Sequence, residues 1–81
     1  MAKNLYVGNL VWEATADDLF ELFQQHGQVA FAQVIMDHDT GRSRGFGFVE
    51  MRTEAEAQQA IAALHGVRFR GRMLIVNAVR S

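Results

Sequence analysis

The sequence contains no cysteine among its 81 residues. This absence excludes a disulfide framework and any metal site built on thiolates. Long apolar runs are also missing, since the longest run of large aliphatic residues is Met73 to Val76. A membrane span needs about 20 apolar residues, and the apolar region of a secretory signal needs about 7–15. We therefore expect an intracellular, cytoplasmic protein that does not associate with membranes.

The sequence also lacks an excess of charge of either sign, because its net charge is −1 at neutral pH. Proteins that bind nucleic acid by charge alone are strongly basic, so this balance argues against that mode of binding. The charges are unevenly distributed along the chain. Residues 1–40 hold one lysine against six acidic residues, whereas residues 41–81 hold seven arginines against three glutamates. The carboxyl-terminal half is therefore the basic half.

A chain of this length is expected to form one small domain, residues 1–81. No linker, low-complexity tract or repeat of solenoid length interrupts it. A domain of this size buries only about 60% of the surface that its unfolded chain exposes. Its core is therefore thin, and nearly every position that faces inward has to be apolar.

Hydrophobic periodicity predicts two helices, residues 15–27 and 53–66, which begin with the capping residues Thr15 and Thr53. The first predicted strand begins at Asn4 and is ended by Gly8 and Asn9. The other predicted strands are residues 29–36, 44–51 and 73–79, with a tight hairpin or short edge ribbon at 67–72. This β-α-β-β-α-β order is typical of an α+β fold, the ferredoxin-like βαββαβ sandwich. A four-stranded antiparallel sheet then carries two helices on one face, and its other face is open to water.

The stretch RGFGFVEM, residues 44–51, alternates glycine with phenylalanine. Because alternate residues of a strand point to opposite faces, Phe46 and Phe48 share one face and the glycines lie on the other. The obvious arrangement buries the rings. However, Arg44 and Glu50 lie on the same face as the rings, and burying an unpaired charge costs several kcal/mol. The pattern therefore favours rings that are open to water and glycines beneath the helices, where they permit close approach.

The other face of this strand, Gly45, Gly47, Val49 and Met51, is then expected under the helices. The first strand adds Tyr6 to the open face, because the residues on either side of it suit the core. Three exposed aromatic rings form an apolar patch that needs a partner. Flat rings stack on unpaired bases at about 1–3 kcal/mol per base. The pattern therefore indicates binding of single-stranded nucleic acid.

The same stretch resembles the octapeptide of the RNA recognition motif (RRM) family, K/R-G-F/Y-G/A-F-V-x-F/Y, at seven of eight positions. The segment LYVGNL, residues 5–10, is similar to the family's hexapeptide on the first strand. The resemblance extends from Lys3 to about Arg80. It is closest to small single-RRM proteins of bacteria and to the RRM of glycine-rich RNA-binding proteins. It implies that residues 1–81 form a single RRM domain that binds single-stranded RNA.

The resemblance also implies that Tyr6, Phe46 and Phe48 stack on RNA bases and that Arg44 contacts a phosphate or a base. Met51 replaces the final aromatic residue of the octapeptide. Because that position alternates inward, the change is expected to affect packing rather than stacking.

Five further candidates surround the three rings. The loop before the third strand supplies Arg42, and the second strand supplies Gln33. The carboxylate of Glu50 is a candidate acceptor for base amino groups. The end of the last strand supplies Asn77 and Arg80, where chain ends of this family often touch RNA.

Two aromatic residues lie outside these motifs. Trp12 is expected to pack over the start of the first helix, and Phe20 at the edge of the core. An exposed Phe20 would instead favour a protein-interaction domain on the RRM fold, which is the alternative function.

Metal binding and catalysis are not indicated. The three histidines, His26, His38 and His65, share no face, and no serine or threonine stands in an identifiable motif with a base and an acid. An acyl-phosphate hydrolase on this fold would need a phosphate loop that the sequence lacks. We therefore expect a monomer with no catalytic residue, metal or cofactor, and with single-stranded RNA, or single-stranded DNA, as its partner.

Overall fold

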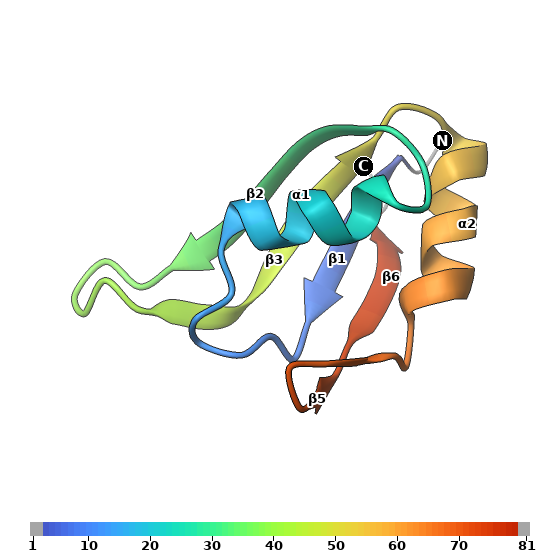
Figure 1. Ribbon diagram of the computed structural model, residues 1–81. Coiled ribbons are helices and arrows are strands. Elements are labelled where there is room, and N and C mark those ends of the chain that lie inside the picture. Colours follow the sequence, from blue (N-terminus) through green and yellow to red (C-terminus); the bar gives the residue numbers. More distant parts are fainter. Residues whose placement is uncertain (1–2, 80–81) are drawn as a thin grey trace.

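The computed structural model describes residues 3–79 and shows one sheet covered by two helices (Figure 1). The sheet is antiparallel and has the strand order β2-β3-β1-β6. Its strands are β1 (Asn4–Gly8), β2 (Val29–Met36), β3 (Ser43–Met51) and β6 (Ile75–Val79). The remaining elements are the helices α1 (Ala16–Gln24) and α2 (Glu54–Leu64), and a short ribbon of β4 (Arg68–Phe69) and β5 (Arg72–Met73). The predicted ferredoxin-like βαββαβ sandwich and the edge ribbon are confirmed.

Helix α1 begins at a capping box. The backbone N–H of Thr15 donates to Asp18 Oδ2 over 2.9 Å, and the backbone N–H of Asp18 donates to Thr15 Oγ1 over 3.1 Å. The hydrogen bond from the Thr15 backbone is the main reason that the pKa of Asp18 lies below its ordinary value. These bonds fix the start of the helix at the predicted residue.

Helix α2 is capped at Thr53, whose hydroxyl accepts from the backbone N–H of Glu56 over 3.1 Å. The carboxylate of Glu56 accepts from the Thr53 hydroxyl over 2.9 Å and from the backbone N–H of Gln28 over 2.7 Å. The hydrogen bond from Gln28 is the largest cause of a lowered pKa at Glu56. The start of α2 is thereby tied to the segment that leads into β2.

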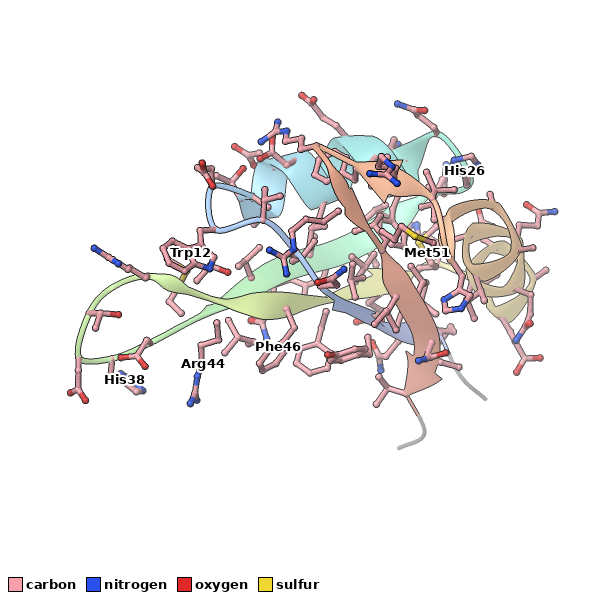
Figure 2. The ribbon with its side chains drawn as sticks, turned by 90° about the horizontal axis from the view of Figure 1, so that it is seen from below. Trp12, His26, His38, Arg44, Phe46 and Met51 are labelled. Carbon is pink, nitrogen blue, oxygen red and sulfur yellow. The ribbon has the colours of Figure 1, made fainter. Side chains whose placement is uncertain are left out.

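The core lies between the helices and the sheet. It includes Leu19 and Phe23 of α1, and small residues of α2 such as Ala57 and Ala60, all of them fully buried. The sheet contributes the inward-facing positions of three strands, which are Leu5, Val7, Val49, Met51 and Val76. Met51 therefore packs inward as expected, and Figure 2 shows it between the sheet and α2.

The glycines of β3 differ in their surroundings. Gly47 is buried under α1, since a Cβ there would lie 3.2 Å from Leu19 Cδ1 and would collide with the carbonyl oxygen of Gln33. Gly45 does not lie under a helix, and that expectation was wrong. Its φ is +87°, and its carbonyl accepts from the backbone N–H of Leu10 over 2.9 Å. The register between β2 and β3 is irregular near this end, so strict alternation does not reach Gly45.

Candidate nucleic-acid interface

Three aromatic rings gather on the open face of the sheet. Tyr6 of β1 and Phe46 of β3 are close to parallel, with an interplanar angle of 28° and ring centroids 5.8 Å apart. Phe48 stands edge-on to both, 6.1 Å from Tyr6 and 6.0 Å from Phe46. Figure 2 shows Phe46 on the side of the sheet opposite the helices. We call these three residues the aromatic platform, and it lies on the face that the sequence predicted.

Strand pairing brings the platform together. Tyr6 lies directly opposite Phe48, and Gly8 lies opposite Phe46. Gly8 leaves room for the tyrosine ring, because a Cβ at this position would lie 2.6 Å from both Cε2 and Oη of Tyr6. The ring of Tyr6 therefore leans over the backbone of its own strand, close to Phe46.

Replacing Gly8 with alanine is expected to move the Tyr6 ring without unfolding the domain. The colliding atoms belong to the far end of a side chain on an open face, so we expect a loss of stability below about 1 kcal/mol. The platform loses part of one stacking surface, which should weaken RNA binding about fivefold. Titration of RNA with the single variant and with Gly8→Ala in a Tyr6→Ala background tests the cause. An equal loss of RNA affinity in both backgrounds would show that Gly8 does not act through the Tyr6 ring.

Polar side chains flank the platform on three strands. Gln33 of β2 lies opposite Phe48, and Asn77 of β6 lies opposite Tyr6, so one row across the sheet has two rings between two exposed amides. Glu50 follows Phe48 on the same face and is half-buried. Amides donate and accept hydrogen bonds, and an ionised carboxylate accepts them. These groups are therefore placed to contact the edges of bases that lie on the rings.

The structure separates the two candidate arginines of the β2–β3 region. Arg44 points to the platform side of the sheet, whereas Trp12 lies on the helix side (Figure 2). The guanidinium carbon of Arg42 is 5.6 Å from the centroid of the Trp12 ring. A cation over an aromatic face is favourable, so this contact holds Arg42 away from the platform. Arg80 lies outside the described residues.

Trp12 does not pack over the start of α1, and that expectation was wrong. Its side chain is 66% exposed, with Arg42 over its ring. Phe20 of α1 is also exposed, at 42%, and therefore lies outside the core rather than at its edge.

The loop between β2 and β3 is closed by its own hydrogen bonds. The carboxylate of Asp37 accepts from the backbone N–H groups of Asp39, over 2.8 Å, and Thr40, over 3.1 Å. These bonds are the main cause of a pKa below the ordinary value at Asp37, and the charge of Arg44 lowers it further. Asp37 therefore stays ionised at neutral pH and provides an anionic neighbour for Arg44.

Sequence reasoning missed one aromatic residue of the open face. Phe31 of β2 lies opposite Glu50 and is 52% exposed. Its position two residues before Gln33 was the available signal, because alternation places both on one face.

Within residues 3–79, no group of three histidine, aspartate or glutamate side chains has the arrangement of a metal site. In the same range, no helix combines the length and apolar character that crossing a membrane requires.

A four-stranded antiparallel sheet with helices on one face and an aromatic platform on the other defines an RRM-type fold. The sequence matches the RNA recognition motif over residues 5–75. The chain belongs to this family, as the motifs on β1 and β3 indicated.

The relatives of the chain include proteins from a plant and a cyanobacterium. The chain is 51% identical to the chloroplastic RNA-binding protein CP31B of Arabidopsis thaliana over 76 residues, which cover 94% of this chain and 26% of that protein. It is 48% identical to the putative RNA-binding protein RbpE of Nostoc sp. over 77 residues, which cover 95% of this chain and 78% of that protein. The chain thus spans about a quarter of the length of the plant relative and most of the cyanobacterial one.

A solved protein/RNA complex has the same fold. The Sxl-lethal protein/RNA complex superposes with a TM-score of 0.93 at 32% sequence identity, over all of this chain and 48% of that one. The similarity therefore covers the complete sandwich described above.

Proposed function

We propose that this chain binds single-stranded RNA by stacking bases on Tyr6, Phe46 and Phe48. The observation that carries the proposal is three rings, 5.8–6.1 Å apart, on the sheet face that no helix covers. Family membership and the RNA bound to a structural neighbour support it. Bases that are unpaired and splayed out are the targets that such rings can reach.

The neighbours of the platform have distinct roles in this proposal. Gln33, Glu50 and Asn77 offer hydrogen bonds to base edges, and Arg44 offers its guanidinium to a phosphate. Arg80 remains a predicted contact at the end of the chain, and Arg42 a weaker one, because Trp12 holds its guanidinium.

The expected affinity is moderate. Three stacked bases contribute roughly 3–9 kcal/mol. Ordering the RNA and its contact side chains offsets part of this gain. Hydrogen bonds to base edges and arginine contacts to phosphates add to the stacking, and we expect a Kd of roughly 1 μM, which corresponds to about −8 kcal/mol. Because few phosphates are contacted, the dependence on salt should be shallow.

Selection of binders from a random RNA pool tests the proposal, followed by titration of the selected RNA and of its DNA counterpart. Micromolar binding that is lost on Phe46→Ala is the supporting outcome. The DNA counterpart shows whether the 2′-hydroxyl contributes, which decides between RNA and single-stranded DNA. Failure of the pool to yield binders above the level of the Phe46→Ala variant would contradict RNA binding.

The proposal includes binding without catalysis, by a monomer in which residues 1–81 act as one domain. We also expect the protein inside the cell, in the cytoplasm. Sedimentation of the free chain tests the monomer, and turnover assays with RNA test the absence of catalysis.

A protein-interaction domain is the second candidate, and the exposed ring of Phe20 on α1 favours it. A protein partner captured by the wild type and by Phe46→Ala, but not by Phe20→Asp, would support this role. Because Phe20 lies on the helix face, such a contact is compatible with RNA on the sheet.

Arg44→Gln is expected to weaken RNA binding several-fold and to reduce the salt slope by roughly 0.7, the value for one phosphate contact on a single strand. Arg42→Gln serves as the matched control, since it removes the same charge from a guanidinium that lies over the Trp12 ring. Titrations at several salt concentrations measure both. Equal losses of RNA affinity in the two variants would show that the positive charge of the region, and not a contact of Arg44, attracts the RNA.

A further inference from the structure

Phe31, Glu50 and Asn4 form a second row on the open face, next to the platform. Phe31 lies opposite Glu50 across β2 and β3, and Glu50 lies opposite Asn4 across β3 and β1. Directly opposed side chains in such a sheet have Cβ atoms about 4.5–5.5 Å apart. Glu50 is two residues beyond Phe48, so the row continues the surface of the platform toward the other end of β3.

A bulge turns Phe31 toward the open face. Val29 pairs with Met51 and packs against the core, whereas Phe31 pairs with Glu50, so two steps along β2 correspond to one along β3. In a regular ladder Phe31 would share the inward face of Val29. The extra residue re-aims the ring into solvent, where it is 52% exposed. The exposure of Phe31 is thus built into the strand register.

The polar members of the row are available for a ligand. Among residues 3–79, the side chains of Glu50 and Asn4 form no hydrogen bond or ion pair with another side chain. An ionised carboxylate presents two acceptor oxygens and no donor, and an amide presents both. The row therefore combines a stacking ring, a pair of acceptors and a donor.

We propose that Phe31, Glu50 and Asn4 form a fourth base position, which selects guanine; this inference rests on the proposed RNA binding. Phe31 supplies the stacking surface. Guanine carries two adjacent donors, N1–H and the N2 amino group, which match the two oxygens of the Glu50 carboxylate, and its O6 accepts from the Asn4 amide. Uracil offers the carboxylate a single donor. The bound segment is therefore four nucleotides long, with three on the platform and a guanine beside it.

The test compares two eight-nucleotide RNA probes, one of uridines alone and one with a single central guanine. Wild-type protein is expected to bind the guanine probe about tenfold more tightly. Glu50→Gln, which replaces one acceptor by a donor, should reduce the preference to about twofold or less. Phe31→Ala should do the same, and each variant should lose more affinity for the guanine probe than for the uridine probe. Their melting temperatures verify the fold.

Two further variants distinguish failure of the fourth base position from failure of RNA binding itself. Phe20→Ala removes an equally apolar exposed ring from the helix face and should leave both affinities unchanged. Phe48→Ala should weaken the binding of both probes. Binding of both probes with equal affinity by the wild type, or a guanine preference that survives in Glu50→Gln, would overturn the fourth position and leave the platform intact. Absence of binding to either probe would overturn RNA binding itself, together with this position.

Discussion

Replacing Phe48 with alanine is expected to weaken RNA binding about tenfold or more and to leave the fold nearly intact. One base loses its stacking partner, at a cost of about 1–3 kcal/mol. The ring lies on the open face, half-buried and edge-on to the rings of Tyr6 and Phe46. Each such aromatic contact contributes about 0.5–1.5 kcal/mol, so the loss of stability should be modest. Titration with the selected RNA and unfolding in urea measure the two effects on the same sample.

Phe23→Ala provides the matched control, because the same ring is removed from a fully buried position of α1. Truncation of a core phenylalanine costs about 3–5 kcal/mol, a large fraction of the stability of a small domain. Phe48→Ala should therefore lose RNA affinity and keep most of its stability, whereas Phe23→Ala should lose stability. A loss of stability in Phe48→Ala as large as in Phe23→Ala would mean that the platform is part of the core.

Gly47→Ala is expected to destabilise the domain more than removal of either phenylalanine ring beside it. The added methyl group would collide with the carbonyl oxygen of Gln33 in the adjacent strand and approach Leu19 Cδ1 to 3.2 Å. Since a backbone atom blocks the site, the strands themselves have to move. We expect a loss of about 3 kcal/mol, at the upper end of the usual cost of overpacking. Urea unfolding of Gly47→Ala and Phe46→Ala makes the comparison.

This result would be unusual for a strand, where larger side chains normally contribute more to stability. It follows because the small residue faces α1 and the large residue faces water. A Gly47→Ala variant that is as stable as the wild type, with Phe46→Ala strongly destabilised, would reverse the two faces of β3.

The face assignment of β3 was predictable because charge and periodicity agree there. Arg44 and Glu50 mark the wet side of the strand, and Gly47 fits the close approach of α1. The helix starts were predictable for a local reason, since the capping hydrogen bonds of Thr15 and Thr53 form with residues three positions along the chain. Local chemistry of this kind is readable from the sequence.

The features that the sequence did not reveal depend on distant partners. Trp12 was expected against α1, but its ring meets Arg42, thirty residues further along the chain. Alternation from Gln33 places Phe31 on the open face, but alternation from Val29 places it inward, and the register shift between β2 and β3 decides between the two. Gly45 departs from the alternation of inward and outward positions, because its positive φ breaks the regular strand. Pairing between strands fixes these positions, and the register of that pairing cannot be read from a single sequence.

Intermolecular nuclear Overhauser effects in the complex with the guanine-containing octamer test the central claim most directly. Base protons should show contacts to ring protons of Tyr6, Phe46 and Phe48, and none to the buried ring of Phe23. Contacts confined to α1 and α2, with the three rings unaffected by RNA, would contradict an RNA-binding surface on the open face of the sheet.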